Sequence, residues 1–157
     1  MKKYSFDLQI YLLQQRYRQH QSITWSSDSC IQDRTIYEDP IFAKILFQQG
    51  LMEKRQYDLY ISLFRDLSIG MRKPCIIIHL DVTPEIALAR IRERSRGFES
   101  GITLEYLQTL HQGYEEFLAD ISRRSTVIRI DWTTFKEIDE VMEIISSQWK
   151  PINPIFN

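Results

Sequence analysis

A run of β-branched and apolar residues, CIIIHLDV at 75–82, limits the possible folds of this 157-residue chain more than any other segment. Pro74 lies just before the run, and the sequence Thr83-Pro84-Glu85, typical of a helix start, follows it directly. A short, continuous apolar run between such boundaries is typical of a strand that is buried on both faces of a parallel sheet. We therefore expect a strand here that leads at once into a helix.

Hydrophobic periodicity along the rest of the chain predicts an alternation of helices with two further strands. The predicted helices are 4–20, 39–50, 53–71, 85–94, 103–122 and 135–148, and the other predicted strands are CIQD at 30–33 and TVIRID at 126–131. Strands separated by helical crossovers predict an α/β fold with a parallel sheet, here of three strands. We expect one domain over 1–150 and a loose tail at 151–157.

Composition and charge exclude several classes of protein. Twenty basic residues face twenty-one acidic ones, and this balance disfavours a general binder of nucleic acids or membrane surfaces. No apolar run approaches the roughly 18 residues of a transmembrane helix. Cys30 and Cys75 each lie in an apolar run. We expect both to be buried, reduced thiols, which indicates a reducing, cytoplasmic compartment.

Charged residues follow the predicted strands at their carboxyl ends. These ends carry Asp33-Arg34, Asp81 and Asp131, and the ligands of parallel sheets bind outside such ends. A carboxylate in this place can hold Mg²⁺ or accept a hydroxyl proton, and an adjacent arginine can bind a phosphoryl group. The alternative for Asp33-Arg34 is a turn with a local ion pair.

The densest basic cluster is RIRERSR at 90–96. Arg90 and Arg94 are four residues apart on one predicted helix face, and Arg96 follows the helix end. Guanidinium groups that converge from a helix end and its loop suit a polyphosphate, because each can bond two oxygens and stays charged. A solvated basic face is the alternative. Together with Asp33 and Arg34, the cluster predicts a phosphoryl-transfer site at one edge of the sheet.

The sequence resembles the deoxynucleoside kinases, the family of deoxycytidine, deoxyguanosine and deoxyadenosine kinases. The resemblance rests on YSFDLQIYLLQQRYRQ, DRTIYEDPIFAKILFQQGLM, LDVTPEIALARIRERSRGFE and GITLEYLQTLHQGYEEFL, in that order. It implies a P-loop kinase-like three-layer fold and transfer of the γ-phosphoryl group of ATP to the 5′-hydroxyl of a purine deoxynucleoside, with Mg²⁺. None of the five glycines fits the family's GxxxxGK[ST] loop, so we expect an N-terminally truncated fold.

The resemblance also implies roles for individual residues. Gln9 matches the glutamine that reads the edge of the nucleobase, and Arg16 and Asp39 match the pair that completes base recognition. Asp33 matches a carboxylate that is tied to Mg²⁺ and serves as proton acceptor. Arg34 matches an arginine that contacts the 5′-hydroxyl and the incoming phosphate.

Further matches extend this assignment to ATP and to the sugar. Arg90, Arg94 and Arg96 match the lid arginines that close over ATP, and Glu99 matches the glutamate that binds the 3′-hydroxyl. The segment DWTTF at 131–135 loosely matches the place where the family packs the adenine of ATP. The resemblance therefore implies catalytic, substrate-binding and phosphate-binding residues along most of the chain.

Two other functions and two explanations of one apolar stripe stay open. A thymidylate kinase shares the DR motif and the lid arginines, although TIYEDPIFAK does not fit its usual continuation. A non-catalytic dimerisation module would explain the missing loop. The predicted helix 53–71 carries an apolar stripe wider than a small sheet needs, formed by Tyr57, Tyr60, Ile61 and Phe64. The family pairs its subunits near this helix, which implies a homodimer, and the alternative is a further segment that covers the stripe.

Overall fold

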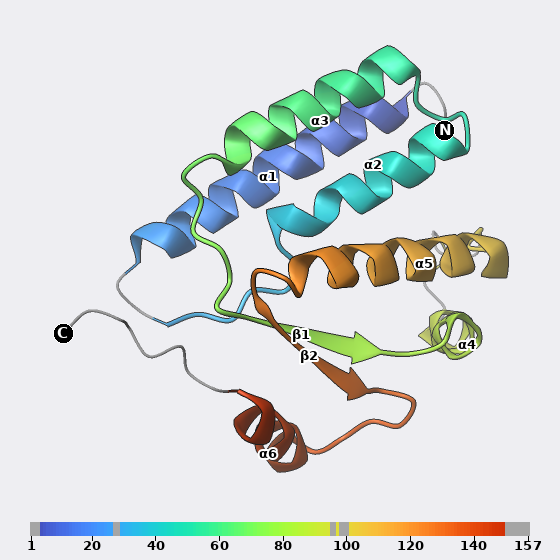
Figure 1. Cartoon of the computed structure of the whole chain (residues 1–157). Coiled ribbons are helices and arrows are strands. Elements are labelled where there is room, and N and C mark those ends of the chain that lie inside the picture. Colours follow the sequence, from blue (N-terminus) through green and yellow to red (C-terminus); the bar gives the residue numbers. More distant parts are fainter. Residues whose placement is uncertain (1–3, 27–28, 95–96, 98–100, 150–157) are drawn as a thin grey trace. The chain divides into compact units, whose positions relative to one another are not determined.

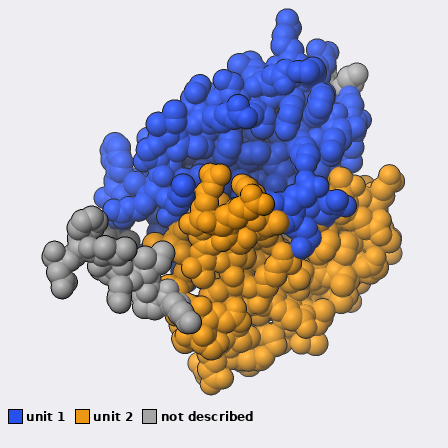
Figure 2. Space-filling view, in the orientation of Figure 1, with its two compact units in different colours: residues 1–73, 112–117 blue, residues 74–111, 118–157 orange. Residues whose placement is uncertain are grey.

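The computed structural model describes residues 4–26, 29–94, 97 and 101–149. The elements along the chain are α1 (Ser5–Trp25), η2 (Ile36–Glu38), α2 (Asp39–Gln48), α3 (Lys54–Ser68), β1 (Ile76–Asp81), α4 (Pro84–Arg94), α5 (Leu104–Ile121), β2 (Thr126–Asp131) and α6 (Ile138–Gln148) (Figure 1). They fall into two compact units, unit 1 with residues 1–73 and 112–117 and unit 2 with the remainder (Figure 2). The expectation of one domain over 1–150 stays a prediction.

Unit 2 contains a parallel sheet formed by β1 and β2, which pair in register along their whole length. In β2, Ile128 and Ile130 are fully buried, whereas Ile78 and Leu80 of β1 are 41% and 45% exposed. The predicted α/β fold with a parallel sheet is confirmed. The expectation that β1 is buried on both faces is wrong, because an apolar run shows which faces can be covered but not whether another element covers them.

The predicted strand at 30–33, the first of the three along the chain, is not formed. Residues 29–32 are irregular, Asp33 and Arg34 form a bend, and the side chain of Ile31 is 98% exposed. A strand persists only where its backbone groups pair with a neighbouring strand, and the sheet of the described residues consists of β1 and β2. Residues 30–33 therefore have no neighbouring strand to pair with in the part of the chain that the structure describes.

The two cysteines are free thiols, as expected, but both Cys30 and Cys75 are exposed. The prediction that they are buried is wrong for the same reason in both places. Cys30 lies in the irregular segment, and Cys75 lies just before the first residue of β1, so neither belongs to a covered element. An apolar neighbourhood in sequence does not by itself bury a side chain.

Unit 1 packs α1, α2 and α3 around one apolar core. The buried members of this core are Leu13, Ile36, Ala43, Met52 and Tyr60. The stripe of α3 enters it, since Tyr60 is fully buried and the partly buried Tyr57, Ile61 and Phe64 pack against it. Side chains of this one unit therefore pack against the stripe, and whether a second subunit also contacts it stays a prediction.

Side-chain caps and left-handed glycines set several helix ends. Glu53 and Gln56 form a capping box at the start of α3, and the Thr103 side chain caps α5. Gly50 and Gly70 follow the ends of α2 and α3 with φ of +68° and +77°, a backbone conformation that glycine adopts without a Cβ clash. Within the part of the chain that the structure describes, no helix is long and apolar enough to cross a bilayer.

Three predicted helices differ from the observed ones by three or more residues at one end. Helix α3 ends at Ser68 rather than at 71. Helix α1 continues beyond residue 20 to Trp25, and within this extension the hydroxyls of Ser22 and Thr24 donate to carbonyls one turn earlier. Helix α6 begins at Ile138 rather than at 135, with Glu137 as its N-cap residue. These differences leave the order of helices as predicted, with η2 as one added short turn.

Gly113 lies where α5 approaches α2 within unit 1. A Cβ atom at this position would lie 2.7 Å from Cγ2 of Ile41, and Ile41 is only 7% exposed. Real Cβ contacts are not this short, so the isoleucine or a helix would have to move. Glycine is therefore required here by close packing and not by backbone conformation.

We predict that Gly113→Ala lowers the free energy of unfolding by about 1 kcal/mol or more, as expected for overpacking. The sign is informative because alanine is normally preferred over glycine in a helix by about 1 kcal/mol. In an Ile41→Leu background, which lacks Cγ2, the same change should cost less. Urea unfolding of the four proteins measures this coupling, and additivity within about 0.5 kcal/mol would contradict the packing argument.

Candidate functional site

Helix α1 turns a line of polar and apolar residues toward the interior of unit 1. Gln9, Leu13, Arg16 and His20 recur at intervals of three or four residues and therefore share one helix face. Gln9 is 7% exposed, and Arg16 lies two turns further along, roughly 10 Å by the helix rise. An amide and a guanidinium thus lie on the same buried face of α1.

Arg16 forms an ion pair with Asp39, the first residue of α2. The Asp39 side chain is 2% exposed and that of Arg16 is 18% exposed, so the pair is largely withdrawn from water. A carboxylate is favoured at a helix N-terminus, but its burial also demands a positive partner. Burial, followed by the nearby positive charge of Arg34, lowers the pKa of Arg16.

The loop before α2 is shaped by Thr35 and Glu38, which form a capping box around η2. The backbone N–H of Thr35 donates to Oε1 of Glu38 at 3.1 Å, and the N–H of Tyr37 donates to the Thr35 hydroxyl at 3.3 Å. Arg34, just before this loop, has a φ of +62°. A left-handed backbone costs a non-glycine residue about 1 kcal/mol, which the surrounding contacts have to offset.

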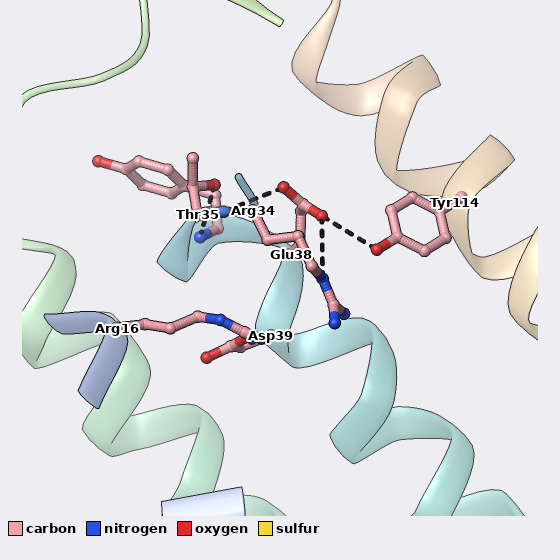
Figure 3. Close-up of polar contacts among 7 residues, drawn as sticks. Arg16, Arg34, Thr35, Glu38, Asp39 and Tyr114 are labelled. Carbon is pink, nitrogen blue, oxygen red and sulfur yellow. Dashed lines mark hydrogen bonds and ion pairs between the residues drawn. The ribbon is translucent and has the colours of Figure 1, made fainter. Parts of the chain in front are cut away.

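The Arg34 guanidinium lies between Glu38 and the ring of Phe42. Its Nε is 3.8 Å from Oε2 of Glu38, an ion-pair contact longer than a hydrogen bond, and its Cζ is 4.3 Å from the ring centroid of Phe42. Figure 3 shows the Nε edge facing Glu38 and the two terminal nitrogens pointing away from it. The two terminal nitrogens of the guanidinium are therefore not directed at the carboxylate of Glu38.

Tyr114, on the part of α5 that belongs to unit 1, completes this cluster. Its hydroxyl donates to Oε2 of Glu38 at 3.0 Å (Figure 3). Its ring lies edge-on to the ring of Phe42. Burial, followed by the negative charge of Glu38, raises the pKa of Tyr114 to about 12. The tyrosine is thus a neutral hydrogen-bond donor at physiological pH.

Sequence reasoning did not find Glu38 or Tyr114. The first was detectable, because Thr35 and Glu38 have the T-x-x-E spacing of a capping box. The second was not, because Tyr114 lies 76 residues further along the chain and its own helix gives no indication of a partner.

The predicted metal ligand, Asp33, is exposed and adjacent to Arg34. Within the described ranges, no group of three or more His, Cys, Asp or Glu side chains could hold a metal ion. Mg²⁺ commonly binds through one or two carboxylates together with substrate phosphates, so a single exposed carboxylate is a donor that fits it.

In unit 2 the structure brings Arg90 against the segment 131–135. Nη2 of Arg90 donates to the carbonyl of Thr133 at 2.9 Å, and its Cζ lies 4.5 Å from the ring centroid of Phe135. Arg94 lies one turn further along α4 and is exposed. The other predicted residues of this group, Arg96 and Glu99, lie outside the described residues.

The carboxyl ends of the two strands carry acids side by side, since Asp81 is the register partner of Asp131. Asp131 accepts the backbone N–H of Thr133 at 2.8 Å, and this bond lowers the pKa of its carboxyl group. Asp81 lies 3.8 Å from Arg129 and 3.7 Å from His79. These acids take part in local contacts of unit 2.

The predicted site residues are thus divided between the two units. Gln9, Arg16, Asp39, Asp33 and Arg34 belong to unit 1. The arginines of α4 belong to unit 2. The hypothesis that Asp33 and these arginines meet at one edge of the sheet stays a prediction.

The raised pKa of Tyr114 generates a prediction for alkaline solution. Tyrosine in the unfolded chain ionises near pH 10, whereas the folded Tyr114 keeps its proton to about pH 12, so unfolding releases a proton between these values. The stability contribution is therefore present below pH 10 and is lost as the pH rises through 12. It amounts to at most about 2.7 kcal/mol.

Tyr114→Phe should accordingly flatten the loss of unfolding free energy between pH 10 and 12. It should also cost about 1 kcal/mol at neutral pH, because the hydrogen bond to Glu38 is lost. Denaturant unfolding of the wild type and the variant across this range measures both effects. Tyr11→Phe, at a position that is 57% exposed, is the matched control and should follow the wild-type profile. Parallel profiles for Tyr114→Phe and the wild type would contradict the assignment.

Comparison with known proteins gives a match to the deoxynucleoside kinase family over residues 1–153. Deoxyadenosine kinase from Dictyostelium discoideum is 50% identical over 149 residues, which cover 95% of this chain and 61% of the relative. Deoxyguanosine kinase from the same organism is 33% identical over 92% of this chain and 53% of its own length. The chain therefore spans between half and two thirds of the length of these curated relatives.

Solved structures show the same relationship. A deoxyadenosine kinase from M. mycoides, described with dCMP and dCDP as bound products, has a TM-score of 0.81 and 30% identity. The match covers 94% of this chain and 76% of that one. A structure of deoxyadenosine kinase from M. mycoides with bound dATP has a TM-score of 0.80 over 92% of this chain and 75% of its own. The fold, the family match and the identities agree, and this chain belongs to the deoxynucleoside kinase family.

Proposed function

We propose that this chain carries the nucleoside-binding part of an ATP-dependent deoxynucleoside 5′-kinase. The reaction transfers the γ-phosphoryl group of ATP to the 5′-hydroxyl of a purine deoxynucleoside. The observation that carries the proposal is the 50% identity to a deoxyadenosine kinase over 149 residues. The same match favours a nucleoside over a thymidylate as the acceptor. Both cysteines are free and exposed, which suits a reducing compartment such as the cytoplasm.

Base recognition is assigned to Gln9 and to the ion pair of Arg16 with Asp39. The amide of Gln9 offers one donor group and one acceptor side by side, as an adenine edge requires from its partner. Gln9 is 7% exposed, so a base that leaves this amide unmatched loses hydrogen bonds that water cannot restore. The Arg16–Asp39 pair is largely buried. It provides a second polar group, fixed in orientation, on the same face of α1 as Gln9.

Phosphate handling is assigned to Arg34 and Asp33. The guanidinium of Arg34 stays charged and can bond two phosphate oxygens, which stabilises the charge that develops during transfer. Asp33 would hold Mg²⁺ together with substrate phosphates, and the metal would supply charge neutralisation at the phosphates. In the same proposal, Arg90, Arg94 and Arg96 bind ATP, and Glu99 binds the 3′-hydroxyl.

Replacement of Gln9 by leucine tests nucleoside recognition. Because a good bidentate contact to a base is worth about 1–3 kcal/mol, Gln9→Leu should weaken deoxyadenosine binding about tenfold or more. Isothermal titration calorimetry on the 157-residue chain measures this affinity. Gln14→Leu, an exposed glutamine on the same helix, is the matched control and should bind like the wild type.

The acceptor in this proposal is a deoxynucleoside and not a nucleotide such as dTMP. Labelled phosphate from ATP should reach deoxyadenosine and not dTMP when the two are offered separately. Equal deoxyadenosine affinities of the wild type and Gln9→Leu would remove Gln9 from the site. Preferential labelling of dTMP would replace the nucleoside kinase with a thymidylate kinase.

We further propose a homodimer through α1 and α3, which lie side by side in unit 1 (Figure 1). Tyr4, the N-cap residue of α1, is 62% exposed, Leu8 of α1 is 53% exposed and Leu59 of α3 is 58% exposed. Large apolar side chains that remain exposed on neighbouring helices are candidates for a subunit contact.

The double variant Leu8→Glu with Leu59→Glu should convert the dimer into a monomer, because charged side chains are costly in the core of an interface. Sedimentation velocity measures the change in mass. Trp25→Glu, at an 83% exposed position near the end of α1, is the control and should leave the dimer intact. A double variant that sediments like the wild type would place the contact elsewhere.

A further inference from the structure

The two carboxylate oxygens of Glu38 have different partners. Oε1 accepts the backbone N–H of Thr35 and so closes the capping box that follows Arg34. Oε2 accepts the Tyr114 hydroxyl at 3.0 Å and faces Nε of Arg34 at 3.8 Å (Figure 3). One side chain thus contacts both the loop that follows Arg34 and the guanidinium itself.

Without the contacts of Glu38, few interactions would fix the orientation of the Arg34 side chain. Its side chain is 37% exposed, and ordering a free arginine side chain costs up to about 2 kcal/mol of conformational entropy. An ion pair of this length at such exposure contributes little on its own. Its left-handed backbone adds a local cost. A fixed orientation of the guanidinium therefore requires that its partner be fixed first.

Tyr114 provides that fixation from a different helix. Its hydroxyl is a donor to Glu38 and also a hydrogen-bond partner of Arg34, and its raised pKa keeps the proton in place. Its ring is held edge-on against Phe42, the same ring on which the Arg34 guanidinium lies. Because the tyrosine is neutral, it holds the carboxylate without competing for the charge of Arg34.

On the basis of the proposed function, we propose that Tyr114 and Glu38 are positioning residues that hold the Arg34 guanidinium with its terminal nitrogens directed at the 5′-phosphate. The carboxylate faces the Nε edge at 3.8 Å, and the terminal nitrogens point away from it, toward the place assigned to the phosphate oxygens. Neither Tyr114 nor Glu38 contacts the nucleoside in this arrangement. Their effect should therefore appear on the phosphate and not on the base or sugar.

The test compares deoxyadenosine with its 5′-phosphorylated product, dAMP, as ligands of the full 157-residue chain. Calorimetry gives the ratio of the two dissociation constants. The wild type should prefer dAMP, and Arg34→Lys should lose most of this preference because lysine presents no fork. Tyr114→Phe should reduce the preference about threefold to tenfold, the effect of one lost hydrogen bond. Its affinity for deoxyadenosine should stay within about twofold of the wild type.

A second readout does not depend on any ligand. The Nε–H resonance of Arg34 in ¹⁵N NMR, assigned by its absence in Arg34→Lys, should shift in Tyr114→Phe and in Glu38→Gln. It should not shift in Tyr11→Phe, the exposed control. Glu38→Gln keeps an oxygen for the Thr35 N–H, so it should retain the loop but lose the hold on the guanidinium.

The outcomes separate the two proposals. If the wild type binds neither ligand, the nucleoside kinase assignment fails and the NMR result alone decides the positioning role. An unchanged Arg34 resonance and an unchanged dAMP preference in Tyr114→Phe would overturn that role. Equal losses of affinity for both ligands would overturn it too, because they would show a structural effect that is not directed at the phosphate.

Discussion

The burial of Asp39 is the constraint on which the arrangement of unit 1 depends. A carboxylate that is 2% exposed needs a positive partner, and Arg16 of α1 is that partner. The ion pair therefore joins α1 to the start of α2, and with it Gln9, seven residues before Arg16, to the loop that carries Arg34. Removal of either partner would leave an uncompensated charge in the interior, a loss of about 3–5 kcal/mol in comparable pairs.

A second acid, Glu38, also has a positive partner, Arg34, at the edge of the core. It is the residue before Asp39, yet its carboxylate turns toward α5 and Arg34 and not toward Arg16. Two adjacent acids thus serve two arginines, one in the proposed base site and one in the proposed phosphate site. In the proposed function, this division gives each end of a nucleoside 5′-phosphate its own positive group on one folded unit.

Some features were readable from local sequence, and others were not. The helices that begin at Thr103-Leu104 and Glu53-Lys54 follow from caps and apolar periodicity, which are local properties of the chain. The strand expected at 30–33 failed because pairing is not local. The prediction that the two cysteines are buried was wrong, because burial depends on which elements cover a segment. The α3 stripe was recognised as apolar, but only packing showed that it lies in the core of its own unit.

The sequence by itself determined the α/β class, most helix boundaries and the family resemblance, because spacing, capping and motif order are written in neighbouring residues. Tertiary structure decided the partners of the charged groups. It brought Tyr114 to Glu38 across 76 residues and placed Arg34 on Phe42. Such contacts are set by how helices pack, and no interval along the chain encodes the distance between two side chains on different helices.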